Sequence, residues 1–424
     1  MKILVLGSGA REHAIILSLL GENAGHSIVA APGNAGIAGD VPVVALNATD
    51  SAAVVALAQA EAVDLVIIGP EAPLVAGVGD ALRRAGFAVF GPDRAAAAIE
   101  GSKNFAKRIM SEANVPTGRA HRAGTLEEVA AALDDLGAPY VVKADGLAAG
   151  KGVLVTSDRA AALAHAQEYL GDGSILIEEF LDGQEVSLFF LSDGRTVLPL
   201  SPAQDFKRLL DADAGPNTGG MGAYSPLPWL DEHFGSERAF IDEVLHTVAE
   251  PVVRQLAAEG TPFVGLLYAG LILVDGGATI KVIEFNARFG DPETQIVLPR
   301  LLTPLSGLLL AAATGELHTQ PRPEFSPLSA VTVVLASEGY PEAPITGREL
   351  HGLEAAGAVP GVHVTHAATA LQEGTLFATG GRVLNVVSLG EGFAQARAGA
   401  YHALGLIELE GGQYRTDIAA KVAN

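Results

Sequence analysis

Residues 281–295 read KVIEFNARFGDPETQ, a short apolar strand that runs into a polar loop. Residues two apart in a strand share a face, so Glu284 and Asn286 are expected to present two oxygen ligands side by side. The alternate positions, Ile283 and Phe285, are then expected to face the core. Carboxylate and amide oxygens suit Mg²⁺, which usually takes one or two protein oxygens and completes its shell with phosphate and water. The stretch therefore predicts a magnesium site for a phosphate-bearing ligand.

Arg288 comes two residues after this pair and is expected to continue the same face. A guanidinium at that place could neutralise a phosphoryl group during its transfer. The alternative is a structural cluster of salt bridges at the end of a strand, with no catalytic role.

A glycine-rich segment lies upstream, where residues 143–152 read KADGLAAGKG. It is not a Walker loop, because its glycine spacing is one residue short and Gly152 stands where a magnesium-binding hydroxyl is needed. Two lysines beside a Gly/Ala loop fit a flap that folds over nucleotide phosphates, and a plain flexible hairpin is the alternative. The candidate phosphate-binding residues are Lys143, Gly146, Gly150, Lys151 and Gly152.

Carboxylates cluster in a third segment, Glu178-Glu179-Phe180-Leu181, with Glu185 four residues further on. One interpretation is an adenine hinge, in which backbone groups contact the base and Glu185 accepts from ribose hydroxyls. The other is a solvated edge strand. The residues alone favour neither.

The first hundred residues alternate short apolar runs with helical patterns, which predicts a doubly wound parallel sheet with helices on both faces. One of the predicted helices covers residues 73–85. Ligands of such sheets gather at the carboxyl ends of the strands. Three loops occupy those ends and could converge on one crevice: Gly7–Gly9, Ala31–Asn34 and Gly69–Glu71.

The first of these loops invites a dinucleotide-binding interpretation. Glu12 occupies the third small position of that motif, and Ala30 and Ala31 end the second strand where an acidic ribose ligand is needed, so the interpretation is weak. The loop could instead hold a single phosphate, with Arg11 adding charge, or be a tight structural turn.

Three domains are predicted. Residues 1–101 form the parallel-sheet domain, and residues 102–326 form a domain of paired strands, with a flap subdomain at about 118–190. One of its strands is expected at Ile175–Phe180. A proline-rich stretch ending at Pro327 marks the second boundary, and residues 327–424 form a small α+β domain. The fold class is therefore α/β and α+β multidomain.

Composition excludes several classes of protein. The net charge of −22 repels nucleic-acid backbones and anionic membranes, and the absence of cysteine removes disulfides, thiolate zinc sites and cysteine nucleophiles. The longest weakly polar stretch, Leu301–Gly315, is shorter than the ~20 residues of a spanning helix. We expect a cytoplasmic protein without nucleic-acid or membrane partners.

Taken together, these motifs resemble the phosphoribosylamine–glycine ligase family of ATP-grasp enzymes, in order and over nearly the whole chain. Three positions depart from the family pattern: Ala10 replaces a glycine, Phe206 a histidine and Ala287 a frequent cysteine. The change at Phe206 leaves in doubt any polar role of that ring. The segments that carry the resemblance are Gly9 with Arg11–Ala14, Ala31–Gly36, Gly69–Val75, Gly101–Lys103, Lys143–Gly152, Gly215–Pro226, Arg288–Gln295 and Gly380–Leu384.

The resemblance implies that ATP drives the joining of glycine to 5-phosphoribosylamine through a glycyl phosphate, with Mg²⁺ or Mn²⁺ as the metal, in purine biosynthesis. It implies a monomer, with a weak dimer as the alternative. The implied ATP ligands are Lys103, Lys143, the loop Gly146–Gly152, the hinge Glu178–Leu181 and Glu185, and the metal ligands are Glu284 and Asn286. The implied substrate ligands are Gly9, Arg11, Asn34, Glu71 and Asp291, while Asp205, Lys207 and Arg288 act at the reacting centre.

Three rival functions would require other residues at these positions. Another ATP-grasp carboxylate–amine ligase of purine metabolism would lack the first-domain loops and the Arg288–Gln295 run, which are present. An NAD-dependent oxidoreductase would need a small residue at Glu12 and an acid near Ala30. A non-catalytic nucleotide-binding regulator would be expected to have lost the metal ligands or Arg288.

Overall fold

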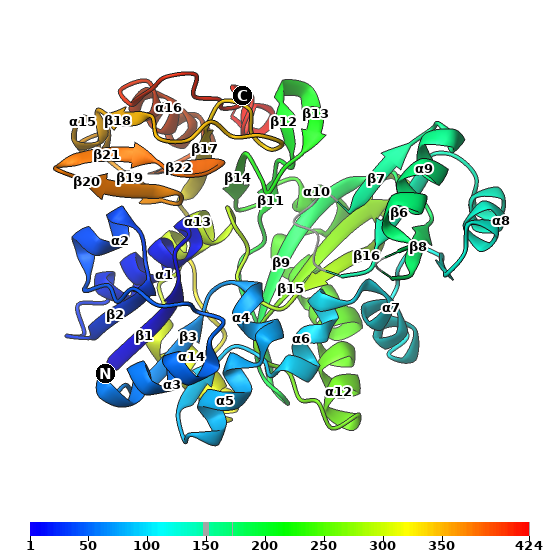
Figure 1. The fold of residues 1–424 in the computed structure, drawn as a ribbon, viewed down its shortest axis with the longest axis horizontal. Coiled ribbons are helices and arrows are strands. Elements are labelled where there is room, and N and C mark those ends of the chain that lie inside the picture. Colours follow the sequence, from blue (N-terminus) through cyan, green and yellow to red (C-terminus); the bar gives the residue numbers. More distant parts are fainter. Residues whose placement is uncertain (147–151, 172, 424) are drawn as a thin grey trace.

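The computed structural model describes residues 1–146, 152–171 and 173–423 and arranges them around six sheets (Figure 1). A parallel sheet comes first, two antiparallel sheets form the centre, and the C-terminal part adds a large and a small sheet; a two-stranded hairpin is the sixth. The predicted fold class, α/β followed by α+β, is confirmed. No helix in these residues is long and apolar enough to cross a membrane.

The N-terminal sheet is buried on both faces, as predicted. Leu4 and Leu6 of its first strand belong to one core cluster, and Ile3 and Val5 belong to another. The strands are β1 (Lys2–Gly7), β2 (Ser27–Pro32), β3 (Leu65–Ile68) and β4 (Ala88–Phe90), in the order β2-β1-β3-β4. The helices are α1 (Ala10–Gly21), α2 (Ala35–Asp40), α3 (Ser51–Ala60), α4 (Glu71–Ala76), α5 (Val78–Arg84) and α6 (Arg94–Gly101).

One predicted helix is wrong. The apolar pattern over residues 73–85 predicts a single helix, but α4 ends at Ala76 and α5 begins at Val78. Gly77 between them has a φ of 84°, in the left-handed region that glycine enters without steric cost. The periodic pattern of apolar side chains is not interrupted by such a one-residue break, so it could not predict the break.

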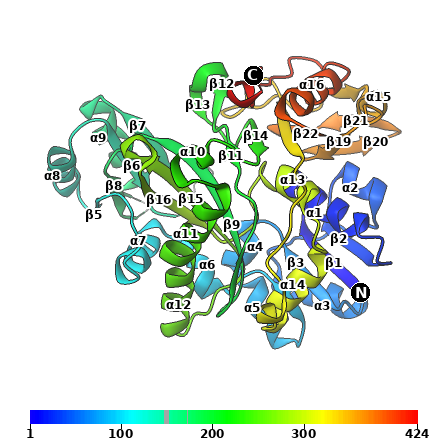
Figure 2. The same ribbon diagram turned by 180° about the vertical axis from the view of Figure 1, so that it is seen from behind.

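The larger central sheet carries the metal-binding candidates. Its strands are antiparallel in the order β10-β9-β15-β16, and a helical layer covers one face (Figure 2). The strands are β9 (Gln184–Asp193), β10 (Val197–Pro199), β15 (Val264–Val274) and β16 (Thr279–Asn286). The layer contains α10 (Leu230–Phe234), α11 (Glu237–Val244), the π-helical turn η2 (Leu245–Ala249) and α12 (Glu250–Ala258).

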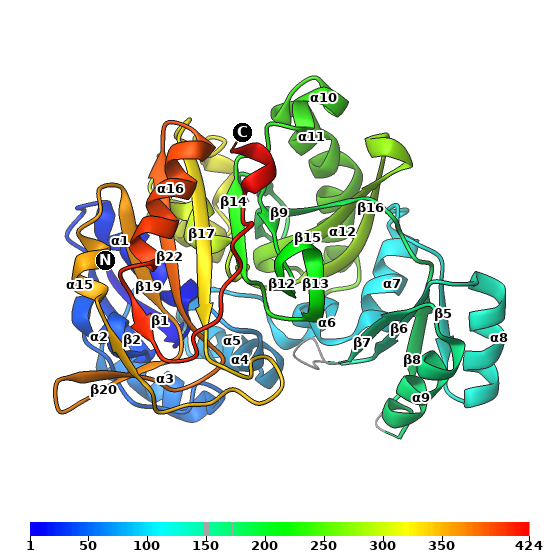
Figure 3. The ribbon, with the colours of Figure 1, turned by 90° about the horizontal axis from the view of Figure 1, so that it is seen from above.

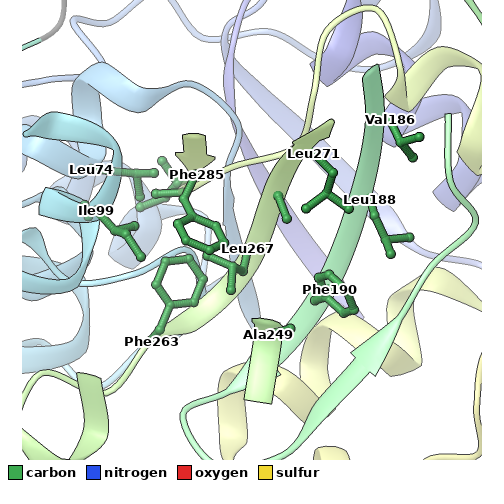
Figure 4. Close-up of a cluster of buried hydrophobic side chains, with 14 of the residues drawn as sticks. Leu74, Ile99, Val186, Leu188, Phe190, Ala249, Phe263, Leu267, Leu271 and Phe285 are labelled. Atoms are coloured by element: carbon green, nitrogen blue, oxygen red, sulfur yellow. The ribbon is translucent and has the colours of Figure 1, made fainter. Parts of the chain in front are cut away.

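The core beneath β16 is shared with the N-terminal unit. In Figure 4, Phe285 lies with Phe263 and Leu267 of the central unit and near Leu74 and Ile99, which come from α4 and α6. All these residues are buried in one cluster. Because apolar interiors are close-packed, this contact fixes β16 against the N-terminal helices.

A β-bulge interrupts β16 and corrects one prediction. Gly270 pairs with Glu284 while Leu271 pairs with Val282, which leaves Ile283 as the extra residue. Val282 is fully buried and Ile283 only half-buried, so the expectation that Ile283 faces the core is wrong. Side-chain alternation restarts after the bulge, with Phe285 buried between the half-buried Glu284 and Asn286.

The second central sheet lies to one side of the molecule (Figure 3). Its strands are antiparallel in the order β5-β8-β6-β7, and two helices pack on it in a separate core cluster. The predicted strand at Ile175–Phe180 ends two residues early. The strands are β5 (Ala120–Ala123), β6 (Tyr140–Ala144), β7 (Val153–Thr156) and β8 (Ile175–Glu178), and the nearby helices are α7 (Lys103–Glu112), α8 (Leu126–Leu136) and α9 (Arg159–Tyr169).

The main C-terminal sheet crosses the predicted boundary at residues 326/327. Its order is β11-β14-β17-β22-β19, so strands from the middle of the chain pair with later ones. The strands are β11 (Gln204–Asp205), β14 (Gly222–Ser225), β17 (Ser329–Ala336), β19 (Val362–His366) and β22 (Arg382–Gly390), with α16 (Phe393–Leu404) against them. The domain limits stay a prediction.

The remaining elements connect these units. Strands β12 (Arg208–Leu210) and β13 (Ala214–Asn217) form the hairpin that follows β11, and α13 (Thr294–Val297), η4 (Leu298–Arg300) and α14 (Leu305–Thr314) lead into the C-terminal unit. The small sheet has the order β20-β21-β18-β23. Its strands are β18 (Glu349–His351), β20 (Thr369–Gln372), β21 (Thr375–Ala378) and β23 (Glu408–Leu409), with α15 (Leu353–Gly357) nearby in sequence.

Candidate active site

Lys207 lies between two carboxylates at the edge of the larger central sheet. Its ammonium pairs with Glu185 of β9 and lies 3.8 Å from Oδ1 of Asp205 on β11. Burial lowers the pKa of Lys207, but the two carboxylates outweigh burial and hold that pKa well above its ordinary value. Burial raises the pKa of Asp205 to about 7, although Lys207 acts in the opposite direction. Near neutral pH, Asp205 therefore exchanges its proton beside a permanent cation.

The second central sheet supplies a buried ion pair. Lys143 of β6 pairs with Glu178 of β8, and Nζ of Lys107 on α7 lies 3.0 Å from the other Glu178 oxygen. Burial acts to raise the pKa of Glu178, but the two ammonium groups outweigh it and the pKa falls below its usual value. One carboxylate thus offsets two lysines, and a net positive charge remains.

Asp145 connects the end of β6 to the start of α7. Its Oδ1 accepts the Lys103 N–H at 2.7 Å, and its Oδ2 accepts from Nδ2 of Asn104 at 2.7 Å. Nζ of Lys103 donates to the carbonyl of Gly146 at 2.9 Å, which directs this lysine toward the glycine-rich loop. Gly146 and Gly152 border that loop, whereas Gly150 and Lys151 lie outside the described residues.

Glu284 and Asn286 leave their oxygens free for a ligand. Neither side chain makes a hydrogen bond to another of the described residues. Glu284 attracts the ammonium groups of Lys103, at the start of α7, and of Lys207, which follows β11. Within the described part of the chain, no three His, Cys, Asp or Glu side chains form a metal-binding group. One carboxylate and one amide therefore fit a hard cation that takes its other ligands from phosphate and water.

The predicted adenine hinge begins at Glu178, the last residue of β8, and continues into the segment that leads to β9 of the other central sheet. The Glu179 N–H donates to the carbonyl of Arg119 at 2.9 Å, and its carboxylate accepts the Arg119 N–H at 2.9 Å. Phe180 is 40% exposed and Leu181 is half-buried, so this apolar pair borders solvent. That position suits contact with a ligand's ring, but the role of the hinge stays a prediction.

A buried carboxylate occupies the loop after β1. The Gly9 N–H donates to Oε2 of Glu12 at 2.7 Å, and Nε of Arg11 donates to Oε1. A Cβ atom added to Gly69 would lie 2.1 Å from Oε1 of Glu12, and one added to Gly7 would lie 2.5 Å from its Cδ. The Glu12 carboxylate therefore occupies the helix N-terminus where a pyrophosphate would bind, so a dinucleotide is disfavoured. The same carboxylate contacts both the loop after β1 and the loop after β3.

Arg288 does not continue the face of Glu284 and Asn286, because β16 ends at Asn286. Its guanidinium instead lies 3.0 Å from Glu100 and 3.3 Å from Glu71, two residues of the N-terminal unit. Burial raises the pKa of Glu100, and this effect prevails over the attraction of Arg288. At Glu71 the attraction of Arg288 and Arg11 outweighs burial, so the pKa is lowered.

Two arginines meet at one backbone carbonyl. Nη1 of Arg11 and Nη1 of Arg288 donate to the oxygen of Phe289 at 3.3 and 3.2 Å, respectively. The first loop of the N-terminal unit and the end of β16 therefore come together, with two guanidinium groups where they join.

Asp291 and Asn34 connect these loops to the C-terminal unit. Oδ2 of Asp291 accepts from Nη2 of Arg382 at 3.0 Å, and the pKa of Asp291 is lowered because Arg382 and Arg11 outweigh burial. Nδ2 of Asn34 donates to the carbonyls of Ser8 and His366, and its Oδ1 accepts from the Ile37 N–H. Both amide hydrogens of Asn34 are thus used within the protein.

Sequence reasoning missed several residues that arrange the site. An isolated acid or lysine in a helical pattern gives no signal, because its role depends on a distant partner. Glu12, Glu293 and Arg382 stood in segments that carry the family resemblance, but nothing in those segments indicated a role for them. The missed residues are Glu12, Glu100, Lys107, Glu293 and Arg382, of which Glu293 is buried and accepts from the Tyr268 hydroxyl at 2.7 Å.

The two antiparallel central sheets lie next to a parallel-sheet unit, and lysine ammonium groups lie near the free side-chain oxygens at the end of β16. This arrangement defines an ATP-grasp ligase. The chain matches the Phosphoribosylglycinamide synthetase N domain over residues 1–100, the ATP-grasp (A) domain over 101–294 and the C domain over 330–421. It belongs to the phosphoribosylglycinamide synthetase family.

Named relatives cover the whole chain. A phosphoribosylamine–glycine ligase of Leifsonia xyli subsp. xyli is 70% identical over 99% of this chain and 100% of its own length. One of Streptomyces coelicolor is 54% identical over 100% of both. The crystal structure of the phosphoribosylamine–glycine ligase from Thermotoga maritima has a TM-score of 0.83 and 32% identity, covering 98% of this chain and 100% of that one.

Proposed function

We propose that this protein joins glycine to 5-phosphoribosylamine with cleavage of ATP, giving glycinamide ribonucleotide, ADP and phosphate in purine biosynthesis. The observation that carries the proposal is the 70% identity, over nearly the full length of both chains, to a relative with the name phosphoribosylamine–glycine ligase. The charges around the metal-binding candidates support ATP use, since Lys103 and Lys207 both interact electrostatically with Glu284.

In this proposal the nucleotide lies between the two central sheets. Lys103 and Lys143 hold its phosphates, because the net positive charge around Glu178 and the start of α7 favours an anion there. The loop from Gly146 to Gly152 closes over the phosphates, and Gly150 and Lys151 belong to it. Glu185 and the hinge from Glu178 to Leu181 hold the nucleoside, with the Glu178 side chain acting through Lys143.

Glu284 and Asn286 would hold Mg²⁺, or Mn²⁺ in its place, since both side chains lack hydrogen-bond partners among the described residues. A bound divalent ion would offset the negative charge of the phosphates. Every other contribution comes from the chain itself, which binds, orients and shields the reactants.

The chemistry has two steps. A glycine carboxylate oxygen attacks the γ-phosphorus of ATP, the bond to the bridging oxygen breaks, and ADP leaves with that oxygen. The nitrogen of phosphoribosylamine then attacks the acyl carbon of glycyl phosphate, phosphate leaves, and the nitrogen loses a proton. Arg288 offsets charge on the transferring group, and Asp205 is placed to take the proton because its pKa is about 7.

Phosphoribosylamine is assigned to the junction of the N-terminal loops with Arg288. Gly9, Arg11 and Glu71 border this junction, and the paired guanidinium groups at Phe289 suit a phosphate. Asp291 is proposed to contact the substrate from the other side of the junction. The amide hydrogens of Asn34 are already bonded within the protein, so Asn34 contributes to substrate binding indirectly. It holds the Ser8 carbonyl, and with it the first loop, in position.

We further propose that the enzyme acts as a cytoplasmic monomer, with a weak dimer as the alternative. Its partners are then small molecules alone. Sedimentation velocity at micromolar protein concentration separates the monomer from the dimer.

The test is phosphate release from ATP and Mg²⁺ with glycine and freshly generated phosphoribosylamine, beside reactions that omit each substrate in turn. Release that needs both substrates, with glycinamide ribonucleotide found by mass spectrometry, is the expected result. Release with another acid or amine would favour a sibling ligase. Binding of ATP without any turnover would favour a nucleotide-binding regulator.

A further inference from the structure

Arg415 lies in the C-terminal tail and is buried completely, and its hydrogen bonds involve none of the residues assigned to the reaction. Its side chain is 0% exposed. Nε and Nη2 donate to the two oxygens of Asp417 at 2.7 Å each, and Nη1 donates to Asp213 at 2.7 Å. Nη1 also donates to the carbonyl of Arg208 at 3.2 Å. A guanidinium with this many charge-assisted bonds fixes the groups around it in a set geometry.

The tail segment, Arg415–Asp417, holds the tip of the β12–β13 hairpin. The Thr416 N–H donates to Oδ1 of Asp211 at 2.8 Å, and the Ala212 N–H donates to Oδ2 of Asp417 at 2.8 Å. Ala212 has a φ of 55°, in the left-handed region that residues with a side chain rarely adopt. The tail contacts therefore stabilise a turn that the hairpin would not favour by itself.

Phe206 connects this hairpin to the reacting centre. The centre of the Arg415 guanidinium lies 4.8 Å from the centroid of the Phe206 ring, within the range of a cation–π contact. Side chains alternate along an extended chain, so Asp205 and Lys207 point away from Phe206, and both lie near Glu185. Arg415 thus contacts one face of this segment through Phe206, and the opposite face carries Asp205 and Lys207.

We propose that Arg415 is a positioning residue, which holds Asp205 and Lys207 in their reactive geometry through Phe206 and the β12–β13 hairpin. This inference rests on the proposed function, because it assigns Asp205 and Lys207 to the reaction. It concerns a residue that touches no substrate and that no motif in the sequence marks.

Two readouts test the inference, and the first needs no substrate. Hydrogen–deuterium exchange of residues 205–217 is expected to rise in Arg415→Ala, because the hairpin tip loses its contacts. The second readout is turnover: kcat is expected to fall by about tenfold to a hundredfold, while KM for ATP stays within about twofold, because a small displacement of reacting groups acts on the chemical step. Arg415→Lys should recover only part of kcat, because an ammonium cannot replace the planar fork.

Asp213→Asn provides a second variant that spares the buried arginine, since the Asp213 side chain is 63% exposed. It should shift both readouts in the same direction by a smaller amount. Arg348→Ala is the matched control: this arginine of the C-terminal unit also bonds a carboxylate and a carbonyl, Glu338 and Glu410, but does not touch the hairpin. Neither readout should change in the control.

The possible failures are distinguishable. A wild-type protein that makes no glycinamide ribonucleotide contradicts the proposed function. Wild-type exchange and wild-type kcat in folded Arg415→Ala and in Asp213→Asn would overturn the role of Arg415, even if the wild-type protein makes the product. The same kcat loss in Arg348→Ala would also overturn it, because the effect would then be general to the C-terminal unit.

Discussion

The side chains that carry the proposed chemistry differ in how fully the protein itself satisfies them. Glu284 and Asn286 have no hydrogen-bond partner among the described residues, whereas Lys143, Glu178, Glu185 and Lys207 are all in ion pairs. A group left unsatisfied near the surface of a folded protein is available to a ligand, while a paired group mainly sets the field around it. The contrast sets the two proposed metal ligands apart from the proposed ATP ligands Lys143 and Glu185, whose charges are already paired within the protein.

Replacing Glu284 by Gln is expected to lower phosphate release by about a hundredfold or more, since a metal's charge stabilisation is worth several kcal/mol. Glutamine has nearly the same shape as glutamate, so the melting temperature of the variant should stay unchanged. Phosphate release and thermal melts measure the two effects. Glu354→Gln, an exposed acid of α15, is the control for loss of one negative charge. Wild-type turnover in the Glu284 variant would remove the metal assignment.

Asp205 links stability to pH. Its pKa is about 7 in the folded state against 3.8 unfolded, so the folded state binds the extra proton and loses stability as pH rises from about 4 to 7. Asp205→Asn should therefore raise the free energy of unfolding at pH 8, on the order of 1–4 kcal/mol, and less at pH 5.5, while lowering kcat. Melts at both pH values measure this, with the exposed Asp182→Asn as control. A gain that is equal at both pH values would contradict the burial of an ionised Asp205.

At the scale of elements, Asp145 makes the start of α7 depend on the end of β6. Asp145→Ala removes the acceptor for the Lys103 N–H, which should cost about 1 kcal/mol of stability and raise KM for ATP about fivefold, because Lys103 loses its position. Thermal melts and ATP titrations of turnover measure the two effects.

Asp158→Ala is the matched control, because Asp158 caps α9 on the same sheet and is not among the nucleotide ligands. It should cost a similar amount of stability and leave KM unchanged. If both variants raise KM equally, the effect would belong to the sheet as a whole and the placement of Lys103 by Asp145 would be wrong.

The elements that the sequence predicted well are those with long apolar patterns. The parallel strands and helices of the first hundred residues follow the predicted alternation, because their apolar runs repeat over many positions. The bulge at Ile283 and the break at Gly77 were missed, because each displaces a single residue without changing composition. Strand β11 is two residues long and gives no periodic signal at all.

At the scale of the whole molecule, the N-terminal and C-terminal units meet at histidines, of which His13 is buried and His366 half-buried. The His366 N–H donates to Nδ1 of His13 at 2.9 Å, and Nε2 of His13 is 2.7 Å from Asp40. Since Nδ1 accepts, His13 carries its proton on Nε2 and donates to Asp40. Burial lowers the pKa of His363 and of His366 to about 4. No sequence pattern predicted this interface, because its partners lie more than 350 residues apart.

These histidines make the interface sensitive to acid. Their folded pKa lies below the unfolded 6.5, so their contribution to stability is complete above pH 6.5 and is lost as pH falls toward 4. His363→Gln should reduce the loss of stability between pH 7.5 and 5 by on the order of 1–2 kcal/mol, as measured by thermal melts. His246→Gln, an exposed histidine, should leave the pH dependence as it is. An unchanged slope in His363→Gln would contradict the neutral, buried state of this ring.

The sheet that joins β11 and β14 to β17 and β22 also has a consequence for the order of synthesis. A ribosome releases β11 and the Asp205–Lys207 segment early, but their sheet is completed only when β22 has emerged more than 150 residues later. Domains that form during translation generally fold from the N-terminus onward. The nascent chain can therefore assemble its two central sheets well before the proposed proton-transfer pair is in place, so we expect competence to consume ATP only as translation ends.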